Sequence, residues 1–185
     1  MIIGITGTDG AGKGAVVEYL QTKGYTHYSV RSLIVAEIQK RGLVVHRPHM
    51  KLVGNAMRAE HGGAVMVQTA SETAKEARVT DFVIESIRTV EEVLLLHEYE
   101  GLLLAVDADQ RVRYERIRGR GSETDQITFD EFVEQDDAES KSENTAEQNK
   151  GAVMQMADHT IMNDGTLPEL QTKIEAWLKT LPNNP

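Results

Sequence analysis

The 185-residue sequence carries 29 acidic against 20 basic side chains and a formal net charge of -9, which argues against a general nucleic-acid-binding protein. It contains no cysteine, so disulfides, thiolate metal sites and a cysteine nucleophile are excluded, while its length suits one domain with a full core. No apolar stretch approaches the roughly 18 residues of a membrane span, and the first expected strand leaves no room for a cleavable signal, so we expect a cytoplasmic protein with no membrane or nucleic-acid partner.

The first expected element is a strand at Ile2–Ile5, an apolar run typical of a parallel sheet buried on both faces. It leads into GTDGAGK at residues 7–13, and apolar residues at helical spacing follow to Leu20. This order forms a P-loop, in which backbone N–H groups, the helix N-terminus and a lysine bind phosphates. A glycine-rich turn without a ligand is the alternative. The expected nucleotide-binding residues are Gly7, Thr8, Asp9, Gly10, Ala11, Gly12, Lys13, Gly14 and Ala15.

The loop departs from the usual pattern after its lysine. Lys13 is the expected catalytic cation, because its ammonium can reach the β- and γ-phosphates. Gly14 and Ala15 stand where a hydroxyl would normally bind Mg²⁺. Mg²⁺ would therefore depend on water, on the phosphates and on a carboxylate elsewhere in the chain.

The remaining chain alternates short apolar strands with helices. Strands are expected at residues 25–30, 81–85, 102–106 and 160–162, and helices at 31–41, 50–62, 65–78, 89–99, 109–120 and 167–181, with a break at Pro48. The acidic segment 122–151 is expected to hold an exposed helix with a capping box at Thr128 and Glu131, a break near Asn144, and a second helix through Val153 and Met156. This alternation predicts an α/β fold with a doubly wound sheet of five parallel strands.

Ligands of such sheets bind beyond the carboxyl ends of the strands. The residues that follow expected strands are therefore the candidates for a site. They are Gly7–Lys13, Ser29–Ser32, Glu85–Arg88 and Asp107–Arg111.

The segment Glu85-Ser86-Ile87-Arg88 resembles the Asp-Gly-Ile-Arg of archaeal adenylate kinase-related proteins, and Gly14 resembles the Gly-Lys-Gly of nucleoside monophosphate kinases. The resemblance implies a three-layer α/β/α P-loop NTPase fold. It also implies that Arg88 is a catalytic and substrate-binding residue that holds the acceptor's phosphate. Glu85 would be a substrate-binding residue near the nucleotide, and near the metal through water. The alternatives are a solvated strand end for Glu85 and a surface ion pair for Arg88.

Residues 55–62 resemble the Leu-Arg-Glu-x-x-Gly of the archaeal group, in the arm that closes over the acceptor. This implies that Arg58 is a second phosphate clamp, with an exposed helix arginine as the alternative. Where the family has an arginine after the second strand, this chain has Ile34, and Arg31 is the candidate substitute for substrate binding. The resemblance divides the single domain 1–185 into a core (1–44, 79–120 and 152–185), a helical acceptor-binding arm (about 45–78) and a lid (about 118–151).

Residues 106–120 resemble the helix that leads into the lid of these kinases and of dephospho-CoA kinases. Arg113, Arg116 and Arg120 share one face of this expected helix. Such a face would stabilise the transferring phosphoryl group, with Arg116 and Arg120 as catalytic candidates. Pairing with the acidic segment that follows is the alternative.

Residues 157–167 resemble the Ala-Asp-x-x-Ile-x-Asn-x-Gly-Ser/Thr ending of the same two families. The resemblance implies that Asn163 and Gly165 lie beside the nucleotide base. A strand followed by a capped helix is the alternative. The six histidines show no metal-ligand spacing.

Together these motifs predict an ATP-dependent small-molecule kinase with bound ATP and Mg²⁺. We expect a nucleoside or deoxynucleoside monophosphate as the acceptor, because Arg58 and Arg88 suit a phosphate. One alternative is dephospho-CoA, whose ribose hydroxyl would use the carboxylate of Asp9, itself a candidate substrate-binding residue. The others are a nucleotide-binding regulatory domain with little turnover and a hydrolase, for which no water-positioning residue is evident. We expect a monomer or a homodimer.

Overall fold

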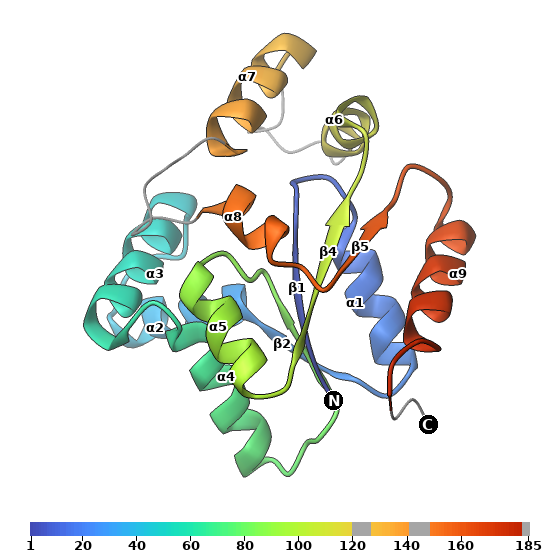
Figure 1. The fold of residues 1–185 in the computed structure, drawn as a ribbon. Coiled ribbons are helices and arrows are strands. Elements are labelled where there is room, and N and C mark those ends of the chain that lie inside the picture. Colours follow the sequence, from blue (N-terminus) through green and yellow to red (C-terminus); the bar gives the residue numbers. More distant parts are fainter. Residues whose placement is uncertain (120–126, 141–148, 183–185) are drawn as a thin grey trace.

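The computed structural model describes residues 1–119, 127–140 and 149–182. Within them, five strands form one parallel sheet in the order β2-β3-β1-β4-β5 (Figure 1). The strands are β1 (Ile2–Gly7), β2 (Thr26–Ser29), β3 (Phe82–Glu85), β4 (Leu102–Asp107) and β5 (His159–Met162). The doubly wound parallel sheet expected from the alternation of elements is confirmed.

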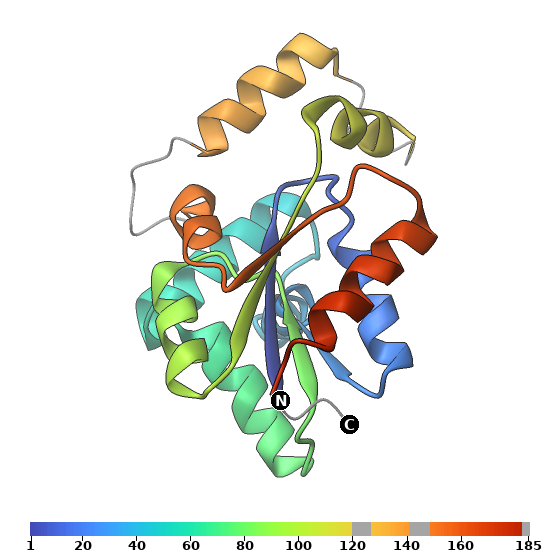
Figure 2. The ribbon, with the colours of Figure 1, turned by 45° about the vertical axis from the view of Figure 1, so that its right-hand side comes forward.

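Helices cover both faces of this sheet, as Figure 2 shows. They are α1 (Lys13–Thr22), α2 (Val30–Lys40), α3 (Arg47–His61), α4 (Val65–Glu76), α5 (Val90–Glu98), α6 (Gln110–Arg118), α7 (Phe129–Ser140), α8 (Lys150–Gln155) and α9 (Leu167–Leu178). α1 and α9 pack on one face, and α2 to α5 with α8 pack on the other. This is the expected three-layer α/β/α arrangement. None of these described helices is long and apolar enough to cross a membrane.

The strand register keeps the two apolar clusters apart. Ile3 lies opposite Val83 of β3, and Ile5 lies opposite Leu104 of β4. All four side chains are fully buried in the cluster beneath α1 and α9. Because successive side chains of a strand point to opposite faces, a slip of one residue would exchange the two clusters. The buried apolar strands therefore fix the register that brings the strand ends together.

Some of the expected helix limits differ from the structure. The break expected at Pro48 is wrong, because Pro48 lies in the first turn of α3, after the N-cap residue His46. A proline fits there, since the first N–H groups of a helix have no intrahelical partner. α4 ends before residue 78, where Arg78 adopts a left-handed φ of 57°. The break expected near Asn144 lies outside the described residues.

α6 and α7 lie beyond the carboxyl end of β4 (Figure 1). α7 begins with the expected capping box, in which Thr128 N donates to Glu131 Oε2 (2.7 Å) and Glu131 N donates to Thr128 Oγ1 (3.3 Å). The ring of Tyr114 on α6 contacts those of Phe129 and Phe132 on α7, with centroids 5.4 and 5.8 Å apart. The two helices therefore form one packed unit. Its role as a lid, and that of residues 45–78 as an acceptor-binding arm, stay predictions.

Candidate functional site

The loop between β1 and α1 follows a path that requires glycine. Gly10 and Gly12 have φ values of 82° and 97°, which side chains disfavour. A Cβ atom at Gly12 would lie 2.5 Å from Nδ2 of Asn163, and one at Gly10 would lie 2.7 Å from the carbonyl oxygen of Arg113. The loop is thus enclosed by two neighbouring segments, and its glycines allow that close approach.

Two distant residues anchor this loop. The hydroxyl of Thr8 donates to Asp107 Oδ1 at the end of β4 (2.5 Å). Nδ2 of the buried Asn163, which follows β5, donates to the carbonyl oxygen of Ala11 (2.8 Å). Asn163, expected beside the nucleotide base, thus has its side-chain donor on the loop itself. Gly165 lies on the same segment and accepts a hydrogen bond from Arg116 at its carbonyl oxygen (3.2 Å).

The Lys13 side chain lies folded over the loop. Its Nζ donates to the carbonyl oxygens of Gly7 (2.9 Å) and Thr8 (2.8 Å). Burial lowers the pKa of Lys13 to about 8, and the positive charges of Arg88 and Lys150 act in the same direction against the opposing effect of nearby carboxylates. An arriving phosphate would therefore meet an ammonium that is short of negative partners.

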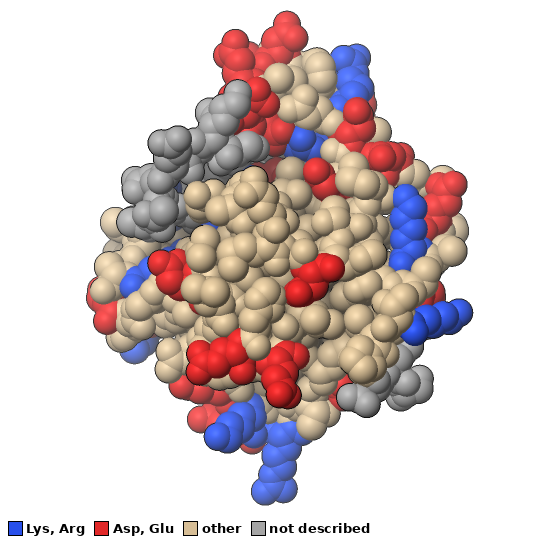
Figure 3. Space-filling view, in the orientation of Figure 1, with Lys and Arg blue, Asp and Glu red and all other residues tan. Residues whose placement is uncertain are grey.

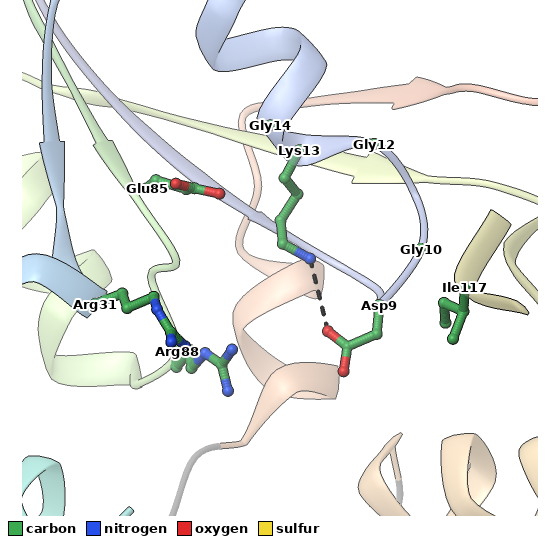
Figure 4. A pocket seen from close by; sticks show the side chains of 9 residues that line it. All are labelled: Asp9, Gly10, Gly12, Lys13, Gly14, Arg31, Glu85, Arg88 and Ile117. Carbon is green, nitrogen blue, oxygen red and sulfur yellow. Dashed lines mark ion pairs between the residues drawn. The ribbon is translucent and has the colours of Figure 1, made fainter. Parts of the chain in front are cut away.

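The carboxyl ends of the strands open into one cavity of about 410 Å³, within the range of ligand pockets. Figure 4 shows Lys13 and Asp9 facing Arg31 and Arg88 across it, with Glu85 also exposed to the cavity. The lining residues are Asp9, Gly10, Gly12, Lys13, Gly14, Arg31, Glu85, Arg88 and Ile117. The cavity therefore brings together five of the nine expected P-loop residues and four of the five expected substrate-binding residues, Asp9 belonging to both groups.

Positive charge in the cavity contrasts with the acidic excess of the chain. Figure 3 shows acidic side chains scattered over one face of the molecule and gathered around α7. Lys13, Arg31 and Arg88, in contrast, all face the cavity. Cations that converge in an otherwise acidic protein favour an anionic ligand at this place.

Glu85 ends β3 and lies beside β2. Its Oε2 is 3.2 Å from Nε2 of His27. The close approach of the His27 imidazole, helped by the charges of Lys13 and Arg88, lowers the pKa of Glu85 although burial acts the other way. Glu85 is therefore ionised at neutral pH. His27 was not among the expected site residues, because a histidine inside a strand gives no signal of a partner on the next strand.

Asp9 lies between two lysines. Its Oδ1 is 3.8 Å from Nζ of Lys13, and its Oδ2 is 3.4 Å from Nζ of Lys150. Burial raises the pKa of Asp9, but the two ammonium groups outweigh it and the net effect lowers this pKa. Lys150 begins α8 and was also missed, because the capping box of its acidic segment gives no sign of a lysine at the site.

The arginines of α6 do not lie as one cationic face toward the cavity. Arg113 is buried and forms a bidentate pair with Asp136 of α7, with Nη1–Oδ1 and Nη2–Oδ2 distances of 2.7 and 2.6 Å. Arg116 donates to the carbonyl oxygens of Asn163 (2.8 Å) and Gly165 (3.2 Å). Arg113 thus pairs with the acidic segment, which was the alternative to a role in phosphoryl transfer. Arg120 lies outside the described residues, and catalytic roles for Arg116 and Arg120 stay predictions.

Arg58 lies inside the fold and does not line the cavity. Its Nη2 donates to Oε1 of the fully buried Glu92 on α5 (3.0 Å), and its Nη1 donates to the carbonyl oxygen of Gly54 (3.4 Å). The alternative of an exposed helix arginine is therefore wrong. The role of phosphate clamp stays a prediction for which these contacts offer no support.

The sheet, the glycine-rich loop and the cation-lined cavity define a P-loop kinase-like domain. A family profile described as an AAA domain matches residues 3–145. A UPF0200 protein of Pyrococcus horikoshii is 32% identical over 100% of this chain and 99% of that protein, and one of Pyrobaculum aerophilum is 29% identical over 94% of each. The chain belongs to this AAA domain family and to the UPF0200 family.

Solved structures show the same fold at low sequence identity. TT1252 from Thermus thermophilus gives a TM-score of 0.63 at 20% identity, with 99% of this chain and 98% of that chain covered. Shikimate kinase from Aquifex aeolicus gives 0.58 at 15% identity, with 97% and 96% covered. The expected P-loop kinase-like superfamily and its three-layer fold are confirmed.

Proposed function

We propose that the protein is an ATP-dependent phosphotransferase that moves the γ-phosphate of ATP to a nucleoside monophosphate. One observation carries this proposal: the P-loop lysine and two guanidinium groups, those of Arg31 and Arg88, line the same cavity. A phosphate donor needs the first group, and an acceptor that itself carries a phosphate needs the second. Guanidinium groups bind phosphate oxygens in a bidentate geometry, so an acceptor that carries a phosphate matches this side of the cavity.

In this mechanism the protein supplies position and charge. The N–H groups of the loop and the N-terminus of α1 bind the donor's phosphates, and Lys13 exchanges its carbonyl partners for their oxygens. Arg31 and Arg88 hold the acceptor's phosphate so that one of its oxygens lies in line with the γ-phosphorus. A bond forms between that oxygen and phosphorus, while the bond to the β–γ bridging oxygen breaks and ADP leaves. The acceptor oxygen is already ionised, so no general base is needed.

The residues present fit Mg²⁺ as an ion bound mainly by phosphates and water. No group of three or more histidine, aspartate and glutamate side chains able to hold a metal occurs among the described residues. The cavity offers single carboxylates, and Glu85 is held ionised by His27. Mg²⁺ accepts such a site, because it keeps several of its waters. When bound with ATP, it neutralises phosphate charge, and Glu85 would orient its waters.

Phosphorylation of a ribose hydroxyl is the second candidate, favoured by the carboxylate of Asp9 in the cavity. Asp9 would accept the proton of the hydroxyl. The lysines beside it lower its pKa, however, and this makes Asp9 a weaker base. A phosphate acceptor therefore agrees better with the site. A regulatory domain with little turnover remains a third candidate, because the hydroxyl after Lys13 is absent.

The test is an assay of ADP formation from ATP and Mg²⁺ with a panel of nucleoside monophosphates, their deoxy forms and dephospho-CoA. We expect ADP to form only with a nucleoside monophosphate. Arg88→Ala should raise KM for that acceptor about 10- to 100-fold, the effect of losing a hydrogen bond to a charged group. Lys13→Ala should abolish turnover. Arg111→Ala is the control, since Arg111 lies on the exposed side of α6 beside Phe129.

Other outcomes would contradict the proposal in different ways. Turnover with dephospho-CoA alone would favour the hydroxyl acceptor. ADP formation without any acceptor would indicate a hydrolase. Nucleotide binding without turnover on the whole panel would favour the regulatory domain. Unchanged acceptor kinetics in Arg88→Ala would remove Arg88 from the acceptor site.

A further inference from the structure

On the side of α6 and α7, the described arginines of α6 do not line the cavity, so they supply no cation for a transferring phosphate there. Phosphoryl transfer builds negative charge on the donor's terminal oxygens, and kinases balance it with cations from more than one side. Here Lys13 lies on the P-loop side, with Arg31 and Arg88 opposite. Arg113 and Arg116 of α6 are held by Asp136 and by backbone carbonyl groups.

Lys150 is a cation that reaches the P-loop from another element. Its Nζ lies 3.4 Å from Oδ2 of Asp9, whose other oxygen lies 3.8 Å from Nζ of Lys13. The Lys150 side chain is only 11% exposed, close to the 14% of Lys13. Lysine is seldom buried to this degree, because its ammonium is strongly hydrated. Its burial beside a second ammonium places two positive charges next to the loop that is expected to bind phosphates.

The backbone holds Lys150 in this position. α8 begins at Lys150, and its N-terminus is capped by Asn149, whose Oδ1 accepts from the N–H of Ala152 (2.9 Å). Val153 of the same helix is fully buried in the core beneath α5, and α8 packs against β1. In Figure 4, α8 passes below the loop between Arg88 and Asp9. The core therefore fixes the backbone from which the Lys150 side chain reaches the loop.

We propose that Lys150 is a catalytic residue that binds the terminal phosphate of the donor nucleotide, with Asp9 holding its ammonium until the nucleotide arrives. This inference rests on the proposed function. A triphosphate brings more negative charge to the loop than the carboxylate of Asp9 provides. The flexible side chain of lysine has three donors and can turn from one oxygen to another without moving α8. The two ammonium groups that share Asp9 would then flank the phosphate that is transferred.

The experiment compares nucleotide binding in three variants of the full chain. Lys150→Met removes the charge, Lys150→Arg keeps it, and Lys40→Met is the control, since Lys40 is exposed on α2 beside Glu37. Each protein is titrated with Mg²⁺ and a non-hydrolysable ATP analogue, and separately with ADP. We expect Lys150→Met to weaken binding of the triphosphate about tenfold and that of ADP less than about twofold. Lys150→Arg should retain most of the affinity, and Lys40→Met all of it.

A structural role of Lys150 would give a different pattern. If Lys150 only supported the loop, Lys150→Met would weaken ADP and the triphosphate alike, and this result would overturn the proposal. Equal triphosphate affinity in Lys150→Met and the unaltered protein would also overturn it. Neither measurement needs an acceptor, so a failed search for the acceptor affects the proposed function alone. An unaltered protein that binds no nucleotide would contradict both.

Discussion

Three charged side chains of the cavity, those of Asp9, Lys13 and Glu85, lie beside other groups of the protein. The ammonium of Lys13 donates to two carbonyl oxygens of its own loop, and the carboxylate of Asp9 lies between the ammonium groups of Lys13 and Lys150. Glu85 is paired with His27 on the neighbouring strand. The two carbonyl oxygens accept hydrogen bonds from the Lys13 ammonium in the absence of ligand, as its burial requires. For Lys13, nucleotide binding is therefore an exchange of these carbonyl oxygens for phosphate oxygens.

The lowered pKa of Lys13 makes nucleotide binding depend on pH. The ammonium is lost at about pH 8 in the folded chain, against an ordinary pKa of 10.5. If only the charged form binds phosphate, affinity for ATP should fall about tenfold between about pH 7 and pH 9. Titration calorimetry at several pH values measures this. Lys13→Arg is the matched control, because its guanidinium stays charged and should remove the step.

The lowered pKa of Lys13 makes the folding stability rise with pH, whereas it makes the affinity for ATP fall. Between about pH 8 and 10.5 the unfolded chain binds more protons at Lys13 than the folded chain does, so this group makes the nucleotide-free protein more stable as pH rises. Below about pH 8 both states carry the proton, and the cost of burying the charge is fully present. For binding, an ATP affinity that stays constant between about pH 7 and pH 9 would show that the charge of Lys13 does not decide it.

At the scale of elements, the P-loop depends on segments far away in the chain. The segment between β5 and α9 supplies Asn163 to the carbonyl oxygen of Ala11, 152 positions earlier. α6 lies so close that a side chain at Gly10 would meet its backbone. The loop that binds the phosphates is thus shaped by contacts formed only when the whole sheet has assembled.

Replacing Asn163 distinguishes support of the loop from recognition of the base. Asn163→Ala leaves the carbonyl oxygen of Ala11 without its donor, which should cost about 1–3 kcal/mol of stability. It should also weaken binding of ATP and GTP by the same factor, because the loop binds phosphates that both share. Urea unfolding and titrations with the two nucleotides measure these effects. A change in the preference between ATP and GTP would instead support the expected position beside the base.

Arg58 and Glu92 join α3 to α5 by a buried ion pair. Arg58→Met leaves the charge of Glu92 buried without its partner, which should cost about 3–5 kcal/mol of stability. The double variant with Glu92→Gln should recover part of this loss, because no unpaired charge remains. Urea unfolding measures both. KM for the acceptor, measured where the variants are folded, should stay unchanged, and a rise specific to Arg58→Met would show that Arg58 is the phosphate clamp after all.

At the scale of the molecule, the sequence was informative where local patterns suffice. Buried strands, the P-loop and the capping box of α7 depend on neighbouring residues, and all three were predicted. The partners of Arg58 and Asn163 were not, because Glu92 and Ala11 meet them only through the tertiary fold. For Arg113, the acidic segment was the alternative interpretation, but the sequence did not single out Asp136 within it. An arginine that binds phosphate and one that binds a buried carboxylate look alike in a sequence. Lys150 gave no signal for the same reason.

The apolar core predicts how the molecule unfolds. Val53 and Met57 of α3 and Met66 of α4, all in the expected arm, belong to one buried cluster with Ile84 and Leu103 of the sheet. An arm that shares the core of the sheet cannot lose its structure alone without opening that core. We therefore expect a single cooperative thermal transition for the nucleotide-free protein, followed by calorimetry. Two separated transitions would show that the arm is an independent unit.

Nucleotide binding should raise the temperature of this transition as a whole. A ligand at 100 times its dissociation constant adds about 2.7 kcal/mol to stability, which for a chain of this size corresponds to about 5–10 °C. An ATP analogue with Mg²⁺ should produce this shift in the unaltered protein, and Lys13→Met should lose it. Because α1, α6, α8 and the segment after β5 all contact the loop, the shift should be the same whether followed by tryptophan fluorescence at Trp177 on α9 or by helix content. A shift seen by one probe alone would place the stabilisation in a local segment and contradict this coupling.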